Sequence, residues 1–265
     1  MTRLLVDRSN AVVALDPDRR QQDACRPPRR HRQAAADHAG LLADALGVDV
    51  RTVASEPAAA RTGALTTPGG RPDALVVDLG AGTIDAIAPG SEVVAAGAGA
   101  LLTRAVATTL GVPRAAADWI KRGPCLRVEG GQRFEAEDGS RGFLERPAPA
   151  AATGMLVATG PAGLLPFDRD HSPAEWRALR LRLKEAIFGA NLGRVLGSGA
   201  VAAPQVLVVG GPAGDDELLG VLARSLPEGV AVGRAAVGGT LGGAATLGHR
   251  YAAALGLALH LVAAE

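Results

Sequence analysis

The sequence predicts an α/β fold, in which strands alternate with helices, and three segments carry most of that prediction. Residues 74–79 and 205–209 are apolar runs that lead directly into glycines, which is typical of strands covered on both faces. Between them, residues 172–195 show the clearest helical pattern, with Ser172 placed to cap the helix and Pro173 suited to its first turn. We therefore expect a sheet that helices cover.

The first 70 residues combine short elements with one polar segment. Predicted in chain order are strands at 3–7 and 11–15, a helix at 33–46, a strand at 48–53 and a helix at 56–65. Residues 16–32 contain three prolines and six arginines, which is typical of a solvated loop, although such a basic cluster is also able to contact phosphate groups. No role follows for its arginine-rich part, residues 19–32. A Pro-Gly-Gly sequence ends this region, so we divide the chain into domains 1–70 and 71–265.

The second domain carries the remaining elements. Predicted in order are the strand that contains Asp78, residues 92–96 as its hairpin partner, a helix at 100–110, a β-rich stretch at 123–147, the helix at 172–195, the strand at 205–209, a helix capped by Asp215 or Asp216, a glycine-rich loop at 242–248 and a helix at 249–262. In open α/β sheets, ligands bind at the carboxyl ends of the strands, where both glycine turns lie.

Composition excludes several classes of function. The 28 Lys and Arg residues balance 27 Asp and Glu residues, so nothing in the net charge favours nucleic acid or an anionic membrane. Two isolated cysteines without metal spacing indicate a reduced, cytoplasmic protein without a zinc site. The longest apolar tract, residues 251–264, is shorter than the roughly 20 residues of a membrane span. The five histidines, His249 among them, show no paired spacing and are interpreted as surface or packing residues.

The strand that contains Asp78 ends in a pattern that builds phosphate sites. Asp78 is placed to hold a divalent cation directly or through water. Gly80 and Gly82 allow a tight turn whose N–H groups point at a phosphate, and Thr83 adds a hydroxyl donor. An ordinary turn between two strands is the alternative interpretation of the same pattern.

The order of these motifs resembles that of a known superfamily. A strand with an acidic glycine turn, followed far along the chain by a strand ending in Gly-Gly, resembles the second phosphate loop and the adenosine loop of the actin, sugar-kinase and heat-shock ATPases. Within it, Gly63–Gly69 followed by Asp78–Gly82 is similar to the large subunit of the diol and glycerol dehydratase reactivases. Other positions that fit this family are Glu56, Gly97, Ala98, Gly99, Arg177, Arg180, Lys184, Glu185, Phe188, Asn191, Arg194, Gly210, Gly211, Gly248, Arg250, Ala252 and Gly256.

This resemblance, which covers residues 40–262, implies an actin-like (ribonuclease H-like) ATPase fold with a reduced first lobe and a complete second lobe. It implies a chaperone-like factor, at most a weak ATPase, that loosens an adenosylcobalamin-dependent dehydratase so that damaged cobalamin leaves and intact coenzyme enters. The expected cofactors are ATP or ADP with Mg²⁺. The expected partner is a dehydratase subunit or a small reactivase subunit.

The resemblance also assigns residues. Asp78 faces the metal and is the candidate catalytic residue. The other candidate positions are Gly80, Ala81, Gly82 and Thr83 at the phosphates, Gly210 and Gly211 at the adenosine, and Lys184 and Glu185 at its base and ribose. By spacing alone, Arg180, Lys184 and Glu185 are instead expected on an exposed helix face.

The sequence departs from the family in ways that bear on hydrolysis. The central insertion and much of the first lobe are missing. The first phosphate loop survives only as residues 7–13, where Ser9 replaces a glycine and Val12 and Val13 replace hydroxyl-bearing residues. Ile84 replaces a threonine, and Ala100 replaces an acid. Since phosphoryl transfer depends on positioned donors and metal, we expect binding to persist where hydrolysis is slow or absent.

Two other functions remain open on this evidence. One is a binding or scaffold protein of the same fold that has lost its nucleotide chemistry. The other is a small-molecule kinase, which is less well supported because only Asp78 and Asp85 offer a catalytic carboxylate. Nucleotide binding and turnover, measured with and without an acceptor, distinguish the three.

Overall fold

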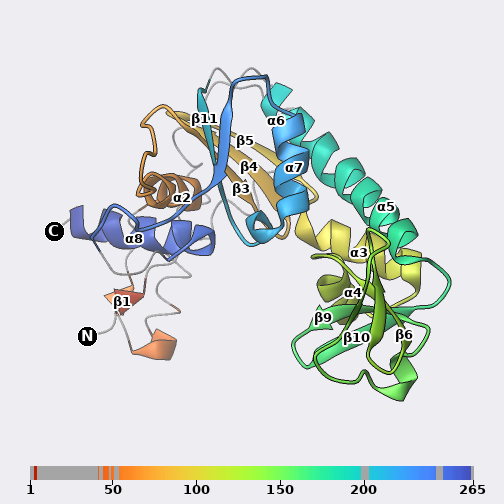
Figure 1. The fold of residues 1–265 in the computed structure, drawn as a ribbon. Helices are drawn as coiled ribbons and strands as arrows, with labels where there is room; N and C mark the ends of the chain where they lie inside the picture. Colours follow the sequence, from red (N-terminus) through yellow and green to blue (C-terminus); the bar gives the residue numbers. More distant parts are fainter. Residues whose placement is uncertain are drawn as a thin grey trace. The chain divides into compact units, whose positions relative to one another are not determined.

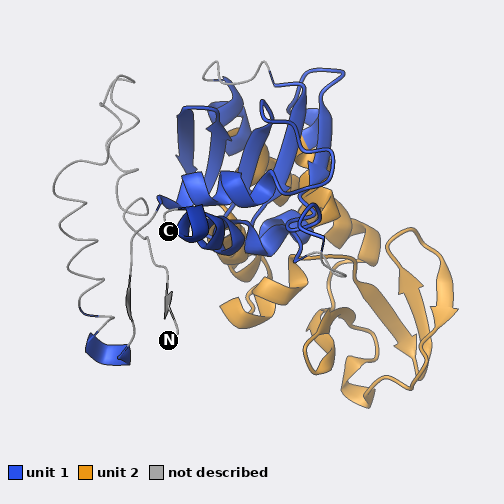
Figure 2. Ribbon diagram, turned by 90° about the vertical axis from the view of Figure 1, so that its left-hand side faces the viewer, with its two compact units in different colours: residues 1–96, 191–214, 223–265 blue, residues 97–190, 215–222 orange. Residues whose placement is uncertain are grey.

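The structure is a computed structural model, and it describes residues 3–4, 41, 44–47, 49–50, 54–197, 203–242 and 247–263. The strand at 11–15, the phosphate loop at 7–13, the arginine-rich segment and most of the helix at 33–46 lie outside the described residues. The chain divides into two compact units, coloured blue and orange in Figure 2. Unit 1 comprises residues 1–96, 191–214 and 223–265, and unit 2 comprises residues 97–190 and 215–222. This division does not test the domains 1–70 and 71–265, which stay a prediction.

Unit 1 is built on a five-stranded mixed sheet with the order β12-β11-β3-β4-β5. Its strands are β3 (Leu75–Leu79), β4 (Thr83–Ala88), β5 (Ser91–Ala96), β11 (Gln205–Val209) and β12 (Ala231–Arg234). The strands β12, β11 and β3 run parallel, whereas β4 and β5 continue the sheet as antiparallel hairpins. The two predicted apolar strands are therefore confirmed, and they are direct neighbours (Figure 1).

The hairpin prediction was wrong in one respect. The antiparallel partner of β3 is β4, and the segment 92–96 belongs to β5, which pairs with β4 instead. The turn after β3 is short enough for the Gly80 N–H to donate to the Thr83 carbonyl at 2.9 Å. The chain therefore re-enters the sheet at Thr83, in a segment that sequence reasoning assigned to the glycine turn alone.

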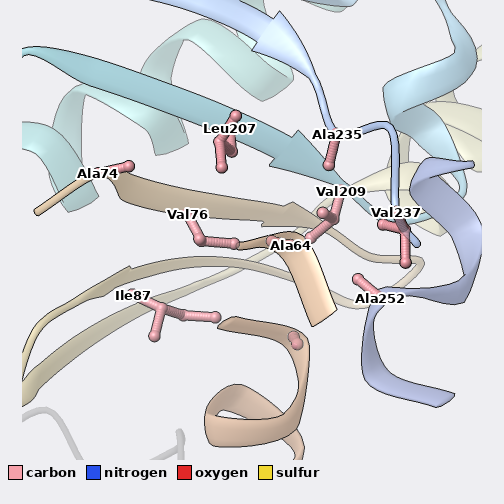
Figure 3. Packing of buried hydrophobic residues seen from close by; sticks show 10 residues of the cluster. Ala64, Ala74, Val76, Ile87, Leu207, Val209, Ala235, Val237 and Ala252 are labelled. Atoms are coloured by element: carbon pink, nitrogen blue, oxygen red, sulfur yellow. The ribbon is translucent and has the colours of Figure 1, made fainter. Parts of the chain in front are cut away.

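Two helices, α2 (Glu56–Ala64) and α8 (Ala252–Ala263), lie side by side on unit 1 (Figure 1). Ser55 caps α2, and the helices approach closely because glycines lie at the contact. A Cβ atom on Gly63 would lie 2.0 Å from the Ala252 carbonyl oxygen, and one on Gly256 would lie 1.8 Å from that of Ala59. Figure 3 shows how alanines of both helices meet valines of β3 and β11 in a buried cluster.

Two further pieces of the first 53 residues are described. The strands β1 (Arg3–Leu4) and β2 (Asp49–Val50) form a parallel pair, in agreement with strands predicted at 3–7 and 48–53. Residues 41 and 44–46 are helical. Among the described residues, no helix has the length and apolar character that crossing a bilayer requires.

Unit 2 contains an antiparallel sheet with the order β10-β9-β6-β7-β8. The helices α3 (Gly99–Leu110) and α4 (Arg114–Ile120) precede it, and its strands are β6 (Leu126–Gly130), β7 (Arg133–Ala136), β8 (Arg141–Phe143), β9 (Leu156–Gly160) and β10 (Gly163–Asp168). The predicted β-rich stretch is confirmed, and it continues to residue 168. A 3₁₀ turn at Ala150–Ala152 joins β8 to β9.

The helical pattern at 172–195 corresponds to three consecutive pieces, which are α5 (Pro173–Lys184), a π-helical segment (Glu185–Gly189) and α6 (Ala190–Gly197). Ser172 and Glu175 form a reciprocal capping box, which confirms the predicted start. The expected exposed face is wrong for Arg180 and Lys184, whose side chains are fully buried, whereas Glu185 is exposed. A helical spacing of charges does not distinguish a solvated face from a buried ion-pair network.

The remaining elements follow β11 in the chain. A 3₁₀ turn η4 (Pro212–Gly214) leads to α7 (Asp216–Arg224), and a second 3₁₀ turn η5 (His249–Tyr251) leads into α8. Asp215 caps α7, because its Oδ1 atom accepts from the Glu217 and Leu218 N–H groups at 3.0 and 3.3 Å. The strand β12 and the helix α4 had no counterpart in the sequence-based prediction.

Candidate functional site

Two glycine turns lie next to each other at the carboxyl ends of β3 and β11. Val209 is the register partner of Asp78, so the turns that follow both strands leave the sheet at the same edge. Gly210 has a φ of 90°, and a Cβ atom there would lie 2.3 Å from both the Asp78 Oδ1 atom and the Leu79 carbonyl oxygen. Only glycine fits this position, because it combines left-handed backbone with close approach to β3.

The outer parts of both turns are open. Among the described residues, apart from the adjacent ones in the chain, no atom lies within 4 Å of a Cβ atom placed on Gly82 or on Gly211. Ala81 and Gly82 are exposed, and their N–H groups have no hydrogen-bond partner among the described residues. Backbone N–H groups in a turn of this kind form an anion-binding concavity. The structure therefore brings Asp78, the loop 80–83 and the Gly210-Gly211 turn together within unit 1.

Three carboxylates on β3, β4 and β5 are half-buried, and within the described part of the chain none of them forms an ion pair with a cation. Burial, followed by the charges of Asp85 and Glu56, raises the pKa of Asp78 to about 7. Burial also raises the pKa of Asp85 to about 6, although a hydrogen bond from Thr83 opposes the shift, and it raises that of Glu92 to about 7 with the help of Asp85 and Glu56. Asp78 and Asp85 are direct register partners on adjacent strands, and the buried Oδ1 atom of Asp85 has no hydrogen-bond partner among the described residues.

This donor set fits a cation that is held partly by water and phosphate. Within the described residues, no group of three or more His, Cys, Asp and Glu side chains is close enough to hold a metal ion. Mg²⁺ commonly keeps several waters and binds through one or two carboxylates together with substrate phosphates. Asp78 is the carboxylate that lies against the open turns, so it is the residue that would hold such an ion.

Residues that sequence reasoning missed hold the Gly210 turn in place. The Gly210 N–H donates to the His249 carbonyl at 3.0 Å, and the His249 Nδ1 atom lies 2.7 Å from the Gly210 carbonyl oxygen. The Arg234 Nε atom donates to the Ala213 carbonyl at 2.6 Å. No sequence spacing predicts these contacts, because His249 and Arg234 are separated from the turn by more than 20 residues of chain.

Lys184 and Glu185 belong to unit 2, whereas Asp78 and both glycine turns belong to unit 1. The Lys184 Nζ atom donates to the Asp215 Oδ2 atom at 2.5 Å and to the Glu217 Oε2 atom at 2.6 Å. Asp215 caps α7 and Glu217 lies in its first turn, and both belong to unit 2. The Lys184 ammonium is thus used by internal ion pairs, whereas the exposed Glu185 side chain lies over Gly189 of the π-helical segment.

Arg180 extends this buried network. Its guanidinium binds Glu137 with contacts of 2.6 and 3.0 Å and Glu217 with contacts of 2.6 and 2.9 Å. Burial opposes the ionisation of Glu217, but hydrogen bonds from Arg180 and Lys184 outweigh it and lower the pKa of Glu217 to about 2. The network joins α5, the end of β7 and the start of α7 within unit 2.

Similarity to solved structures agrees with this architecture. A diol dehydratase-reactivating factor in nucleotide-free form superposes with a TM-score of 0.71 and 32% identity, over 86% of this chain and 39% of that one. MreB5 of Spiroplasma citri bound to ADP superposes with a TM-score of 0.52 over 88% of this chain and 66% of that one. Its 14% identity shows the fold alone, which confirms the predicted actin-like α/β class.

The sequence matches agree with the structural ones. The propanediol dehydratase-reactivating factor large subunit of Salmonella typhimurium is 36% identical over 184 residues, which are 65% of this chain and 30% of that protein. The chain therefore spans about a third of the length of this curated relative. Residues 29–261 match the family described as the diol dehydratase reactivase ATPase-like domain. Since this match covers most of the chain, the protein belongs to the diol dehydratase reactivase ATPase-like domain family.

Proposed function

We propose that the protein binds ADP or ATP with Mg²⁺ at the paired turns of unit 1 and serves as a chaperone-like reactivating factor for an adenosylcobalamin-dependent diol or glycerol dehydratase. The observation that carries the proposal is the junction of two open glycine turns with buried, uncompensated carboxylates at the ends of β3 and β11. Family membership adds the chaperone role, because a relative is named as a dehydratase-reactivating factor large subunit.

The roles of the residues follow from their chemistry. Asp78 holds Mg²⁺, and the N–H groups of the loop 80–83, with the Thr83 hydroxyl, bind the phosphates. Gly210 and Gly211 approach the adenosine, since neither presents a side chain to it. Lys184 and Glu185 remain proposed for the base and ribose side. Because Lys184 is engaged by Asp215 and Glu217, an indirect role through these carboxylates fits it better than direct contact with the nucleotide. The lobes 1–70 and 71–265 remain part of this proposal.

Hydrolysis is proposed to be slow or absent. Ser9, Val12 and Val13 replace the donors of a working first phosphate loop, and this loop lies outside the described residues. Loss of a single preorganised donor commonly costs about two to three orders of magnitude in rate. Phosphate release in the range of ordinary kinases, about 1–100 per second, would contradict this part of the proposal.

Calorimetric titration with ADP and Mg²⁺ tests the binding site. Gly211→Val places a side chain against the base and should weaken binding at least tenfold, whereas Asp78→Asn should weaken only the Mg²⁺-dependent part. Gly233→Val on β12 is the matched control, because a Cβ atom there also has no protein atom within 4 Å. The wild-type protein failing to bind ADP at millimolar concentration would overturn the proposal.

The partner is proposed to be a dehydratase subunit or a small reactivase subunit. Nucleotide can change such an affinity only through differential binding to two conformations. Co-purification from the native host, with and without ATP, tests this proposal. Recovery of no cobalamin-enzyme component in either condition would favour the second candidate, a scaffold protein without nucleotide hydrolysis. The replaced donors of the first phosphate loop favour that candidate.

A further inference from the structure

The contacts of His249 with Gly210 form a reciprocal pair. The main chain of His249 accepts from the Gly210 N–H at 3.0 Å, and the imidazole Nδ1 atom meets the Gly210 carbonyl oxygen at 2.7 Å. A carbonyl oxygen only accepts, so Nδ1 carries the proton and the Nε2 position is the unprotonated nitrogen of the neutral ring. One residue thus fixes both polar groups of Gly210.

Fixing the Gly210 carbonyl also fixes the next N–H group. The carbonyl of Gly210 and the N–H of Gly211 belong to one planar trans peptide unit, in which they point in opposite directions. Holding the oxygen toward His249 therefore aims the Gly211 N–H away from His249. The Gly210 backbone itself packs closely on β3, since a Cβ atom there would lie 2.3 Å from the Asp78 Oδ1 atom and from the Leu79 carbonyl oxygen.

The Gly211 N–H lies in an open environment. It has no hydrogen-bond partner among the described residues, and no protein atom lies within 4 Å of a Cβ atom placed on Gly211. An N–H group that is oriented by a neighbouring contact and left without a protein acceptor is suited to a ligand acceptor. We propose that His249 is a positioning residue that aims the Gly211 N–H at an acceptor atom of the adenosine side of the bound nucleotide. This inference rests on the proposed function of the same turn.

Three substitutions at His249 separate the hydrogen bond from the volume of the ring. His249→Asn keeps an N–H donor close to the Nδ1 position, His249→Gln moves the donor one methylene further out, and His249→Ala removes it. A hydrogen bond contributes about 0.5–1.5 kcal/mol, which corresponds to roughly a two- to twelvefold change in affinity. We expect His249→Ala and His249→Gln to lose this factor for ADP with Mg²⁺, and His249→Asn to stay within about twofold of the wild type.

Inorganic pyrophosphate with Mg²⁺ is the second probe, because it occupies the phosphate side without an adenosine. Its affinity should be the same in all four proteins. Equal ADP affinity of His249→Ala and the wild type would overturn the inference, as would equal losses for ADP and pyrophosphate. His249→Asn binding as weakly as His249→Ala would also overturn it. Where His249→Ala does not fold, the Asn and Gln variants decide.

A measurement without ligand keeps this inference distinct from the proposed function. Long-range ¹H–¹⁵N spectra of the wild-type protein, recorded where the ring is neutral, should show His249 with a protonated Nδ1 and an unprotonated Nε2. The opposite tautomer would overturn the positioning role even if ADP binds. Absence of ADP binding with the expected tautomer would instead overturn the proposed function and, with it, the ligand assigned to the Gly211 N–H.

Discussion

Each unit contains a cluster of acids withdrawn from water. The acids of unit 2 are paired with buried cations, whereas those of unit 1 are not paired with any cation of the described residues. In unit 1, burial raises the pKa values of Asp78, Asp85 and Glu92, and the charge of Asp85 raises those of Asp78 and Glu92 further. In unit 2, Glu137, Asp215 and Glu217 surround the fully buried side chains of Arg180 and Lys184, and hydrogen bonds hold the pKa of Glu217 low.

The difference separates structural from ligand-binding chemistry. A buried acid that is paired with a buried base is satisfied within the chain, and removing one partner is costly. A buried acid without a base leaves a charge that an external cation can neutralise. Unit 2 therefore uses its acids for its own stability, whereas the acids of unit 1 fit the metal ion that we propose for it.

The largest effect is expected from breaking the network of unit 2. Lys184→Met leaves Asp215 and Glu217 buried with one cation fewer, which should lower the free energy of unfolding by about 3–5 kcal/mol. Arg182→Met on the same helix is the control, since Arg182 is exposed and should change stability by less than about 0.5 kcal/mol. Urea denaturation measures both values, and equal midpoints for the two variants would contradict the comparison.

The two clusters should also respond to pH in opposite directions. In unit 1 the folded state holds protons more tightly than the unfolded chain, so stability should fall as the pH rises from about 4 to about 7. In unit 2 the lowered pKa of Glu217 stabilises the fold above about pH 4.5, and this contribution should be lost as the pH falls towards 2.

Asp78→Asn isolates the unit 1 contribution. It should raise the free energy of unfolding at pH 8 by on the order of 2 kcal/mol and leave it unchanged at pH 4, where Asp78 is already protonated. Asp73→Asn, at an exposed side chain in the same unit, should give no such pH-dependent gain. Denaturation curves at both pH values check the prediction, and a gain that is equal at the two would contradict it.

The Gly210-Gly211 turn provides a test of the same comparison through its backbone. Gly210→Ala places a Cβ atom 2.3 Å from the Asp78 carboxylate at a φ of 90°, so it should cost about 1–3 kcal/mol of stability. Gly211→Ala has no protein atom within 4 Å and should be nearly neutral. Thermal unfolding of the two variants side by side tests this, and equal losses would mean that Gly210 does not contact β3 as described.

The smallest effect concerns Mg²⁺ without nucleotide. Because unit 1 acids are ionised only at higher pH, 10 mM Mg²⁺ should stabilise the wild type at pH 8 by about 1.4 kcal/mol, the value for an ion that binds with a dissociation constant of about 1 mM. The stabilisation should be smaller at pH 5 and in Asp78→Asn. Replacement of Mg²⁺ by an equal ionic strength of Na⁺ is the control. A stabilisation that is the same at both pH values would exclude the unit 1 acids as its source.

The sequence correctly predicted those elements of the fold that a local pattern of residues encodes. The strands β3 and β11 are continuous apolar runs, and the capping box of Ser172 is a local signal, so all three were predictable. Strand β4 was missed because six residues between two tight turns carry little periodicity.

The rest depends on contacts between distant residues. Lys184 and Arg180 have the spacing of an exposed face, and only the folded positions of Glu137, Asp215 and Glu217 reveal that they are buried. The pairing of His249 with Gly210 likewise joins two segments that no sequence pattern relates. The candidate ligand-binding residues of the two glycine turns could be predicted from the sequence. The residues that hold the Gly210 turn, His249 and Arg234, could not.

The sheet of unit 1 has a consequence for the order in which the protein is made. β3 pairs with β11, and α2 packs against α8. Unit 1 is therefore completed only after β11 (Gln205–Val209) and α8 (Ala252–Ala263) have been synthesised. Residues 97–190, most of unit 2, leave the ribosome as one continuous stretch in between. Non-local strand pairing of this kind slows folding and exposes apolar strands while synthesis continues. While β3 and α2 lack their partners, unit 1 is incomplete. This is the stage of biogenesis at which the chain most needs protection from aggregation.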